Sequence, residues 1–297
     1  MEAAPCSTGY RDEPTAMPAS WAVMGDMFQS VPETTHMIPS GFYSCQPTQR
    51  GPMLRRMNID VDDLIDLPDP TTDMLLKEFV TFWQKAEKYA ERGMSAKRGL
   101  LLWGPPGSGK TSAVQKMATH MMRVLEGIVV MAGEPDTTST LLHDLRAIEP
   151  KRPLIVVYED IDALVERYGE AQFLAMLDGE KQIANVVNVA TTNYPERLDR
   201  RFADRPGRFD RVQYVGMPLA AARRAYFKAR LPDICEQRLE RWVSKSEDWS
   251  IAHLRELVVA TEVLGDEDAE TIERVDGMRD RPNSEQEPGR ERFGIVA

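Results

Sequence analysis

The stretch "GLLLWGPPGSGKTSAVQKMATH", residues 99–120, decides the fold of this chain. A short apolar run leads into a glycine-rich turn, and apolar residues at helical spacing follow the turn. Glycines let backbone N–H groups wrap phosphate oxygens at a helix N-terminus, Lys110 supplies positive charge to the β and γ phosphates, and the Thr111 hydroxyl ligates Mg²⁺. The stretch therefore predicts a site for ATP and Mg²⁺. The predicted nucleotide-binding residues are Gly104, Pro105, Pro106, Gly107, Ser108, Gly109, Lys110, Thr111 and Ser112.

Short apolar runs alternate with helical patterns through the middle of the chain. Continuous apolar strands separated by helices indicate a parallel sheet that is covered on both faces. We therefore predict an α/β fold of the P-loop NTPase type, a three-layer αβα arrangement with a parallel five-stranded sheet and a small helical lid after it. The five expected strands are residues 99–103, 127–131, 154–158, 186–191 and 211–215.

The flanking segments have a different composition and divide the chain further. Residues 1–50 are rich in Pro, Ser, Thr and Met without a period, and are expected to form a flexible arm. A linker and a leading helix are expected over 51–97, where Asp69 is the N-cap and Pro70 the first helical residue. The α/β region follows over 98–218, the lid over 219–265 with Ser250 as a helix cap, and an acidic disordered tail over 266–297.

The overall composition narrows the class of protein. The 297 residues are 42% hydrophobic and carry a formal net charge of −10, so nucleic acid remains possible as a partner but no basic field indicates it. Three widely spaced cysteines, Cys6, Cys45 and Cys235, argue against a disulfide framework or a zinc site. There is no apolar run long enough to span a bilayer and no secretory leader pattern, so we expect a cytoplasmic protein without a membrane partner.

The stretch "LIVVYEDIDAL", residues 154–164, ends a buried strand in acidic residues. Carboxylates at such a position can hold magnesium and polarise a water. On a strand, Glu159 and Asp160 would face opposite sides, so we expect Glu159 to reach Mg²⁺ and Asp160 to reach the water. An alternative register uses Asp160 for the metal and Asp162 for the water, whereas we expect Asp162 to cap the helix that follows.

Polar residues after the next strand extend the same site. Asn193 ends an apolar strand, where an amide can orient the attacking water. The following "RPGRFDR" carries Arg205 and Arg208, and exposed arginines can stabilise a transferring phosphoryl group in a neighbouring subunit.

The segments "GPPGSGKT", "YEDIDAL", "TTN" and "RPGRFDR", in this order and spacing, resemble the AAA family of ATPases from about Val61 to Leu264. The resemblance implies that Glu159 and Asp160 are the Walker B pair, Asn193 is sensor 1, and Arg205 and Arg208 are arginine fingers. It also implies a ring, usually a hexamer, with nucleotide at the subunit interfaces. The motif style is similar to the branch of the mitochondrial Rieske-protein translocase and to stand-alone phage proteins, which also show Glu-Asp.

The lid and the segment between the second and third strands also bear on the resemblance. The lid segment "SIAHLREL" falls where the family contacts adenine or senses the γ-phosphate. His253 is therefore a candidate for contact with the adenine base, and Arg255 is a candidate sensor of the γ-phosphate. For Arg255 an ordinary role on the protein surface is equally open. No aromatic pore loop is present between the second and third strands. Tyr168 and Gly169 are the nearest candidates, but a tyrosine packed at a helix end is favoured.

Together these features predict an ATP hydrolase that works with Mg²⁺ as a homo-hexamer and remodels an unknown protein substrate or adaptor. The proposed catalytic residues are Lys110, Glu159, Asp160, Asn193, Arg205 and Arg208, and the proposed metal ligands are Thr111 and Glu159. Two alternatives remain open: a nucleotide-gated assembly switch with little turnover, and an accessory of a DNA-associated motor. If the chain is encoded by a phage, the expected location is the host cytoplasm.

Overall fold

The computed structural model describes residues 20–24, 27–31, 33–49, 51–59, 65, 67–178, 183–202 and 207–279. The chain divides into two compact units, Met1–Pro39 and Ser40–Ala297. In the first unit, β1 (Ser20–Met24) pairs antiparallel with β2 (Met27–Val31) to form a hairpin. All of the predicted site residues that the structure describes belong to the second unit.

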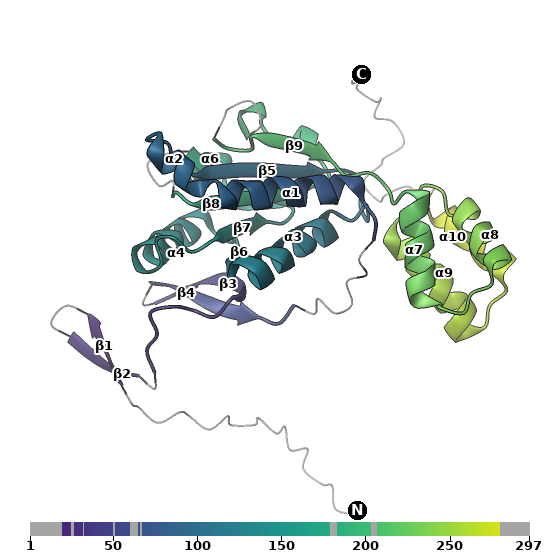
Figure 1. Ribbon diagram of the computed structural model, residues 1–297, viewed down its shortest axis with the longest axis horizontal. Helices are drawn as coiled ribbons and strands as arrows, with labels where there is room; N and C mark the ends of the chain where they lie inside the picture. The colour runs from purple at the N-terminus through teal and green to yellow at the C-terminus, as the bar shows by residue number, and fades with distance from the viewer. Residues whose placement is uncertain are drawn as a thin grey trace, which may run out of the picture. The chain divides into compact units, whose positions relative to one another are not determined.

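The second unit is built on a seven-stranded sheet in the order β4-β3-β6-β7-β8-β5-β9 (Figure 1). The five predicted strands are confirmed and run parallel. Because parallel strands end at the same edge, the segments that follow β5, β7 and β8 meet there. The five strands are β5 (Lys97–Trp103), β6 (Ile128–Met131), β7 (Leu154–Tyr158), β8 (Val186–Thr192) and β9 (Arg211–Tyr214).

A hairpin adds two strands to one edge of this sheet. β3 (Gly41–Thr48) pairs parallel with β6 and antiparallel with β4 (Gly51–Met57). The expected count of five strands was therefore wrong, as was the assignment of these residues to a flexible arm and a linker. Phe42 and Tyr43 are buried against the rest of the unit, and this burial, together with the ladder to β6, stabilises a segment with weak local strand signals.

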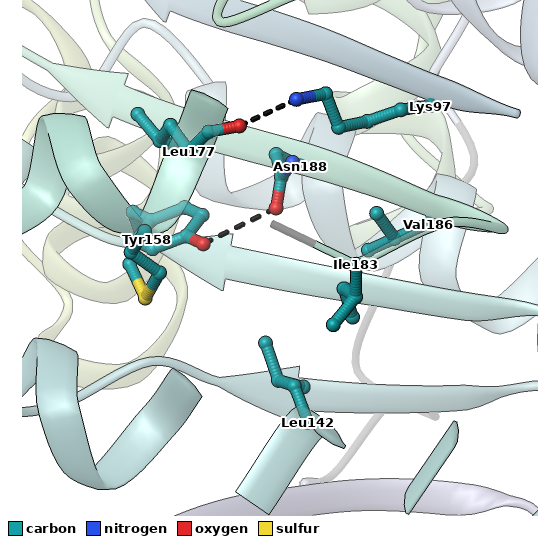
Figure 2. Close-up of a pocket in the computed structure, with 8 residues that line it drawn as sticks. Lys97, Leu142, Tyr158, Leu177, Ile183, Val186 and Asn188 are labelled. Atoms are coloured by element: carbon teal, nitrogen blue, oxygen red, sulfur yellow. Dashed lines mark hydrogen bonds between the residues drawn. The ribbon is translucent and has the colours of Figure 1, made fainter. Parts of the chain in front are cut away.

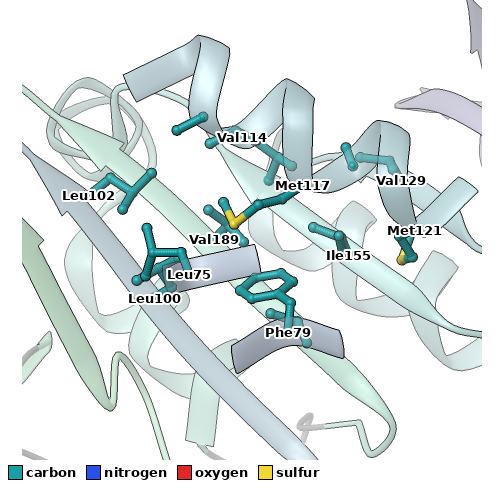
Figure 3. Close-up of a cluster of buried hydrophobic side chains, with 14 of the residues drawn as sticks. Leu75, Phe79, Leu100, Leu102, Val114, Met117, Met121, Val129, Ile155 and Val189 are labelled. Carbon is teal, nitrogen blue, oxygen red and sulfur yellow. The ribbon is translucent and has the colours of Figure 1, made fainter. Parts of the chain in front are cut away.

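Two helices cover one face of the sheet. α1 (Pro70–Gln84) begins where Asp69 accepts hydrogen bonds from the backbone N–H groups of Thr71 and Thr72, which confirms the predicted cap. α1 packs beside α3 (Lys110–Leu125), and α2 (Ala86–Glu91) follows α1. Figure 3 shows the core between these helices and the strands, formed by side chains that include Leu75, Phe79, Leu100, Leu102, Val114, Met117, Val129, Ile155 and Val189.

The other face of the sheet packs against α4 (Pro135–Ile148) and α6 (Glu170–Asp178), with α5 (Ile161–Tyr168) between β7 and α6. Figure 2 shows this face, where the Tyr158 hydroxyl donates to Asn188 Oδ1 at 3.1 Å and so joins β7 to β8. Lys97 Nζ donates to the backbone oxygen of Leu177 beside it. Helices on both faces confirm the three-layer α/β fold.

The polypeptide between β8 and β9 carries two short 3₁₀ turns, η1 (Pro195–Arg197) and η2 (Arg200–Phe202). After β9 the chain forms the predicted lid, made of α7 (Ala220–Arg230), α8 (Glu236–Lys245) and α9 (Ile251–Val258), the last continuing as the π-helical η3 (Val259–Leu264). Phe227, Trp242 and Trp249 form the centre of its core. None of the helices in the described ranges is both long and apolar enough to cross a membrane.

A further helix, α10 (Asp268–Arg279), completes the lid where a disordered tail was expected. Its carboxylates accept hydrogen bonds from two buried indoles: Trp242 Nε1 donates to Asp268, and Trp249 Nε1 donates to Asp276, each at 3.0 Å. Buried indole N–H groups need such acceptors, so these acidic residues are part of the lid rather than of a solvated tail. The remainder of the predicted tail, 280–297, lies outside the described residues.

Candidate nucleotide-binding site

The glycine-rich loop after β5 has the backbone that phosphate binding requires. Gly104, Gly107 and Gly109 have φ values of +156°, +74° and +100°, a region that residues with a side chain rarely adopt. A Cβ on Gly104 would lie 2.1 Å from the backbone oxygen of Val215, so this position also lacks space for one. Because α3 begins at Lys110, the first N–H groups of the helix have no intrahelical acceptor and are available to an anion.

Lys110 is held over this loop by three hydrogen bonds. Its Nζ donates to the backbone oxygens of Gly104 and Pro105 at 2.9 and 3.0 Å, and to Asn193 Oδ1 at 2.6 Å. The side chain is only 7% exposed, and this desolvation lowers the pKa of the ammonium group while the nearby Asp160 opposes the shift. The structure thus brings together Lys110 and Asn193, which sequence reasoning had placed in one site.

Glu159 and Thr111, the two predicted metal ligands, also meet. The Thr111 hydroxyl lies close enough to the Glu159 carboxylate to stabilise its charged form. Burial raises the pKa of Glu159, the negative charge of Asp160 raises it further, and the Thr111 hydroxyl lowers it by less. A hydroxyl and a carboxylate beside a phosphate loop are oxygen donors of the kind that Mg²⁺ prefers, so these residues fit that ion.

Asp160 follows Glu159 in a turn rather than in the strand, because β7 ends at Tyr158. The directions of the two carboxylates are therefore set by the geometry of this turn. They do not follow from the alternation of side chains along a strand, as we expected. Asp160 is exposed and has a left-handed φ of +47°, and its N–H donates to Thr191 Oγ1 at 3.1 Å. Such a backbone conformation is uncommon for a residue with a side chain and is concentrated at functional sites.

Asp162 does not cap the short helix as expected. The N-cap position of α5 belongs to Asp160, and no side chain caps this helix. Asp162 lies in the first turn, where its Oδ1 accepts a hydrogen bond from Thr192 Oγ1 at 2.6 Å. The prediction failed because it assumed that the strand extends to Asp160, which would have moved the helix start by two residues.

Lys110, Asp160 and Asn193 line one cavity of about 330 Å³. A volume of this size is within the range of small-ligand pockets. The lid contributes the first two residues of α9, which sequence reasoning did not single out even though they directly follow the predicted cap Ser250. The lining residues are Pro106, Gly107, Gly109, Lys110, Thr111, Ser112, Asp160, Thr191, Asn193, Ile251 and Ala252.

The candidate lid residues His253 and Arg255 take different places. His253 Nδ1 accepts from the backbone N–H of Ser250 at 3.2 Å, while Ser250 Oγ accepts from the N–H of His253, so the two residues form a capping box at the start of α9. His253 is next to the cavity in sequence but does not line it, and its contact with a nucleotide base stays a prediction. Arg255 is exposed on the same helix.

Of the two predicted arginine fingers, the structure describes Arg208, which does not line the cavity. Arg208 is only 4% exposed and donates from Nη1 to the backbone oxygen of Arg201, so the expectation of an outward side chain was wrong for this residue in the single chain. Its backbone oxygen packs against Gly99, where a Cβ would lie 1.6 Å away. Arg205 lies outside the described residues.

The position of Gly99 shows which end of the sheet Arg208 occupies. Gly99 is near the amino end of β5, a seven-residue strand, and the phosphate loop follows the carboxyl end. A strand of that length spans about 20 Å. Arg208 is therefore at the opposite end of β5 from the phosphate loop of its own chain.

A phosphate loop between β5 and α3, with an acidic turn after β7 on the far side of β8, defines a nucleotide-binding protein of the P-loop class. Residues 100–217 match the model of the family described as "ATPase family associated with various cellular activities (AAA)". The chain therefore carries an AAA domain over residues 100–217. An AAA domain implies nucleotide binding, typically with Mg²⁺.

Several curated proteins are similar to this chain. ATPase family gene 2 protein homolog A of Homo sapiens is 30% identical over 189 residues, which are 57% of this chain and 21% of that protein. ATPase family protein 2 homolog of Caenorhabditis elegans is 30% identical over 199 residues, 60% of this chain and 27% of that protein. The mitochondrial inner membrane m-AAA protease component AFG3L1 of Mus musculus is 31% identical over 173 residues, 52% of this chain and 22% of that protein. The chain thus spans between 21% and 27% of the length of these relatives.

Proposed function

We propose that this protein is a Mg²⁺-dependent ATP hydrolase that acts at the interfaces between copies of the chain in a ring, and that it remodels or moves a protein partner. The observation that carries the proposal is the convergence of Lys110, Asp160 and Asn193 on one cavity, with Thr111 and Glu159 paired at its side. A positive charge, a water-facing carboxylate and an orienting amide are the groups that phosphoryl transfer to water needs.

Each residue has a role that follows from its place. Lys110, poorly solvated and bound to backbone oxygens, exchanges these partners for the phosphates of the nucleotide. Thr111 and Glu159 would hold Mg²⁺, which neutralises charge on the phosphates when it is bound. Asp160 polarises the attacking water and Asn193 orients it.

The ring is supported by the position of Gly207 and Arg208, which we call the arginine turn. Arg208 is at the end of β5 opposite to the phosphate loop, so it cannot serve the nucleotide of its own chain without a large rearrangement. In a closed ring of identical subunits, Arg208 of a neighbour can reach the site instead, once its side chain leaves the backbone oxygen of Arg201. A homo-hexamer in the cytoplasm is the arrangement we propose, with a protein substrate or adaptor that remains to be identified.

Three variants test the hydrolytic assignment. Lys110→Ala should lose nucleotide affinity in calorimetry, because the phosphates lose this side-chain cation. Asp160→Asn should bind ATP and Mg²⁺ but release phosphate very slowly, and Glu159→Gln should need more Mg²⁺ for half-maximal rate. Undiminished ATP binding by Lys110→Ala would contradict the assignment. Negligible turnover by the unmodified protein, with ATP-dependent assembly, would favour the nucleotide-gated switch.

Mixed assemblies test the shared site. A variant with both Arg205→Ala and Arg208→Ala should bind ATP but be almost inactive alone, since an arginine finger contributes about 10³-fold or more to turnover. Mixing it with Lys110→Ala, inactive for a different reason, should restore phosphate release, because some interfaces then combine an intact loop with intact arginines. If verified co-assembly restores no activity, the arginines act within their own chain or only hold the structure together.

A further inference from the structure

We propose that Thr192 and Asp162 are a pair of positioning residues that hold Asn193 and the acidic turn in the arrangement needed for hydrolysis. The inference rests on the proposed ATPase function. It assigns a role to two residues of this chain that lie beside the proposed ATP site. It starts from Thr192, the last residue of β8, which is fully buried at 0% exposure.

The Thr192 hydroxyl donates one hydrogen bond and accepts another. Its Oγ1 donates to Asp162 Oδ1 at 2.6 Å and accepts from the backbone N–H of Tyr194 at 2.9 Å. A hydroxyl has a single hydrogen, so donation to the carboxylate leaves a lone pair for the Tyr194 N–H. Asn193 lies between Thr192 and Tyr194 in the chain. The two hydrogen bonds therefore fix the backbone on both sides of Asn193.

The same contact acts on the acidic turn. Asp162 is two residues after Asp160, whose N–H is held by Thr191 Oγ1 at 3.1 Å. Consecutive threonines of β8 thus hold Asp160 by its backbone and Asp162 by its side chain. Asp160 has a left-handed backbone, and α5 has no side-chain cap, so these cross-strand bonds replace local stabilisation that the turn lacks.

The geometry also separates the two aspartates by role. Asp160 lines the nucleotide cavity, whereas Asp162 does not, and the Asp162 carboxylate is engaged with Thr192. Asp162 is thereby assigned to positioning, in contrast to the alternative in which it polarises the water. Because Asn193 also accepts from Lys110 Nζ, the pair links the acidic turn, the orienting amide and the phosphate loop into one hydrogen-bonded set.

The central test removes the hydroxyl and keeps the shape. Thr192→Val should lower kcat by about 10- to 100-fold, the effect expected when catalytic groups shift by about an ångström, while ATP affinity stays within about twofold. Thr192→Ser, which keeps the hydroxyl, should recover most of the rate. Asp162→Leu should match Thr192→Val, and combining the two should cost little more than either alone, because both remove the same bond.

Asp162→Asn distinguishes positioning from chemistry. The asparagine oxygen still accepts from Thr192, so turnover should stay close to that of the unmodified protein, whereas Asp160→Asn should be nearly inactive. An Asp162→Asn protein as slow as Asp160→Asn would overturn the proposal, since Asp162 would then act on the water. Unchanged kcat in both Thr192→Val and Asp162→Leu would overturn it too.

A general loss of structure is excluded by parallel measurements. Melting temperature and ATP affinity are determined for every variant, and a fall in both that tracks the loss of kcat, without recovery in Thr192→Ser, would assign the pair to stability alone. If Thr192→Val does not fold, Asp162→Leu reports on the same bond from a less buried side chain. Failure of the ATPase function itself would appear separately, as turnover that Lys110→Ala leaves unchanged.

Discussion

Lys110 Nζ donates to Asn193 Oδ1 at 2.6 Å, across 83 residues of sequence. The bond connects the phosphate loop to the residue after β8, and so joins the group proposed to meet the phosphates to the group proposed to orient the water. On this proposal, Asn193 loses its contact with Lys110 when phosphates bind.

Asn193→Ala should separate binding from turnover. Lys110 keeps its two backbone acceptors, so ATP affinity should change by no more than a few fold, while kcat should fall by about 10²-fold because the water loses its orienting amide. Calorimetry and single-turnover phosphate release measure the two quantities. An equal loss of affinity and rate would show that Asn193 serves binding instead.

Gly107→Ala and Gly109→Ala form a matched pair that tests the contact between the lid and the phosphate loop. Both positions have positive φ, so alanine should cost about 1–3 kcal/mol of backbone strain at either one. A Cβ on Gly107 would also lie 2.7 Å from Ser250 Cβ, whereas one on Gly109 meets nothing within 4 Å. Gly107→Ala should therefore weaken ATP binding more than Gly109→Ala does.

Ser250→Gly provides the rescue for this pair. Glycine is tolerated at a helix N-cap and removes the Cβ that would clash, so it should restore part of the ATP affinity lost in Gly107→Ala and none of that lost in Gly109→Ala. Equal rescue of both, or of neither, would show that the lid does not rest on the loop at Ser250.

Glu159 should make the stability of the empty protein depend on pH. Burial and Asp160 raise the pKa of this carboxyl above its ordinary value of 4.5, so the folded protein keeps the proton to a higher pH than the unfolded chain. Its contribution to stability accordingly falls as pH rises through the window between the two values, and stays low above it. Glu159→Gln should raise the melting temperature at pH 7 without Mg²⁺, and this advantage should vanish below about pH 4. A constant difference across the range would contradict the prediction.

We expect the side chain of Asp210 to fix the position of the arginine turn. Its Oδ1 accepts from the N–H of Gly207 at 2.8 Å and its Oδ2 from the N–H of Gly99 at 3.0 Å, which fastens the turn to β5. Asp210→Ala should keep ATP affinity and lose about tenfold in turnover. In mixed assemblies it should be rescued by Lys110→Ala, whose arginine turn is intact, and not by the double arginine variant. Rescue by both, or by neither, would assign Asp210 to general stability.

Much of the fold follows from local sequence. The phosphate loop, the five parallel strands, and the caps at Asp69 and Ser250 were all predicted and confirmed, because each depends on residues within a few positions of one another. Strand ends were less well predicted. Placing Glu159 and Asp160 in the strand instead of the following turn led to the wrong assignment for Asp162.

Only the tertiary structure decided the contacts between segments that are distant in the sequence. The β3–β4 hairpin is stabilised by its ladder to β6, and α10 by acceptors for two buried indoles, and neither segment has a strong pattern of its own. The burial of Arg208 and the bond between Thr192 and Asp162 likewise depend on which strands are neighbours and in what register. Sequence alone determined the chemistry available to this protein, because phosphate-binding and acidic motifs are local. Their mutual geometry was decided by packing, because the distance between two side chains far apart in sequence is set by the strands and helices between them and by no short pattern.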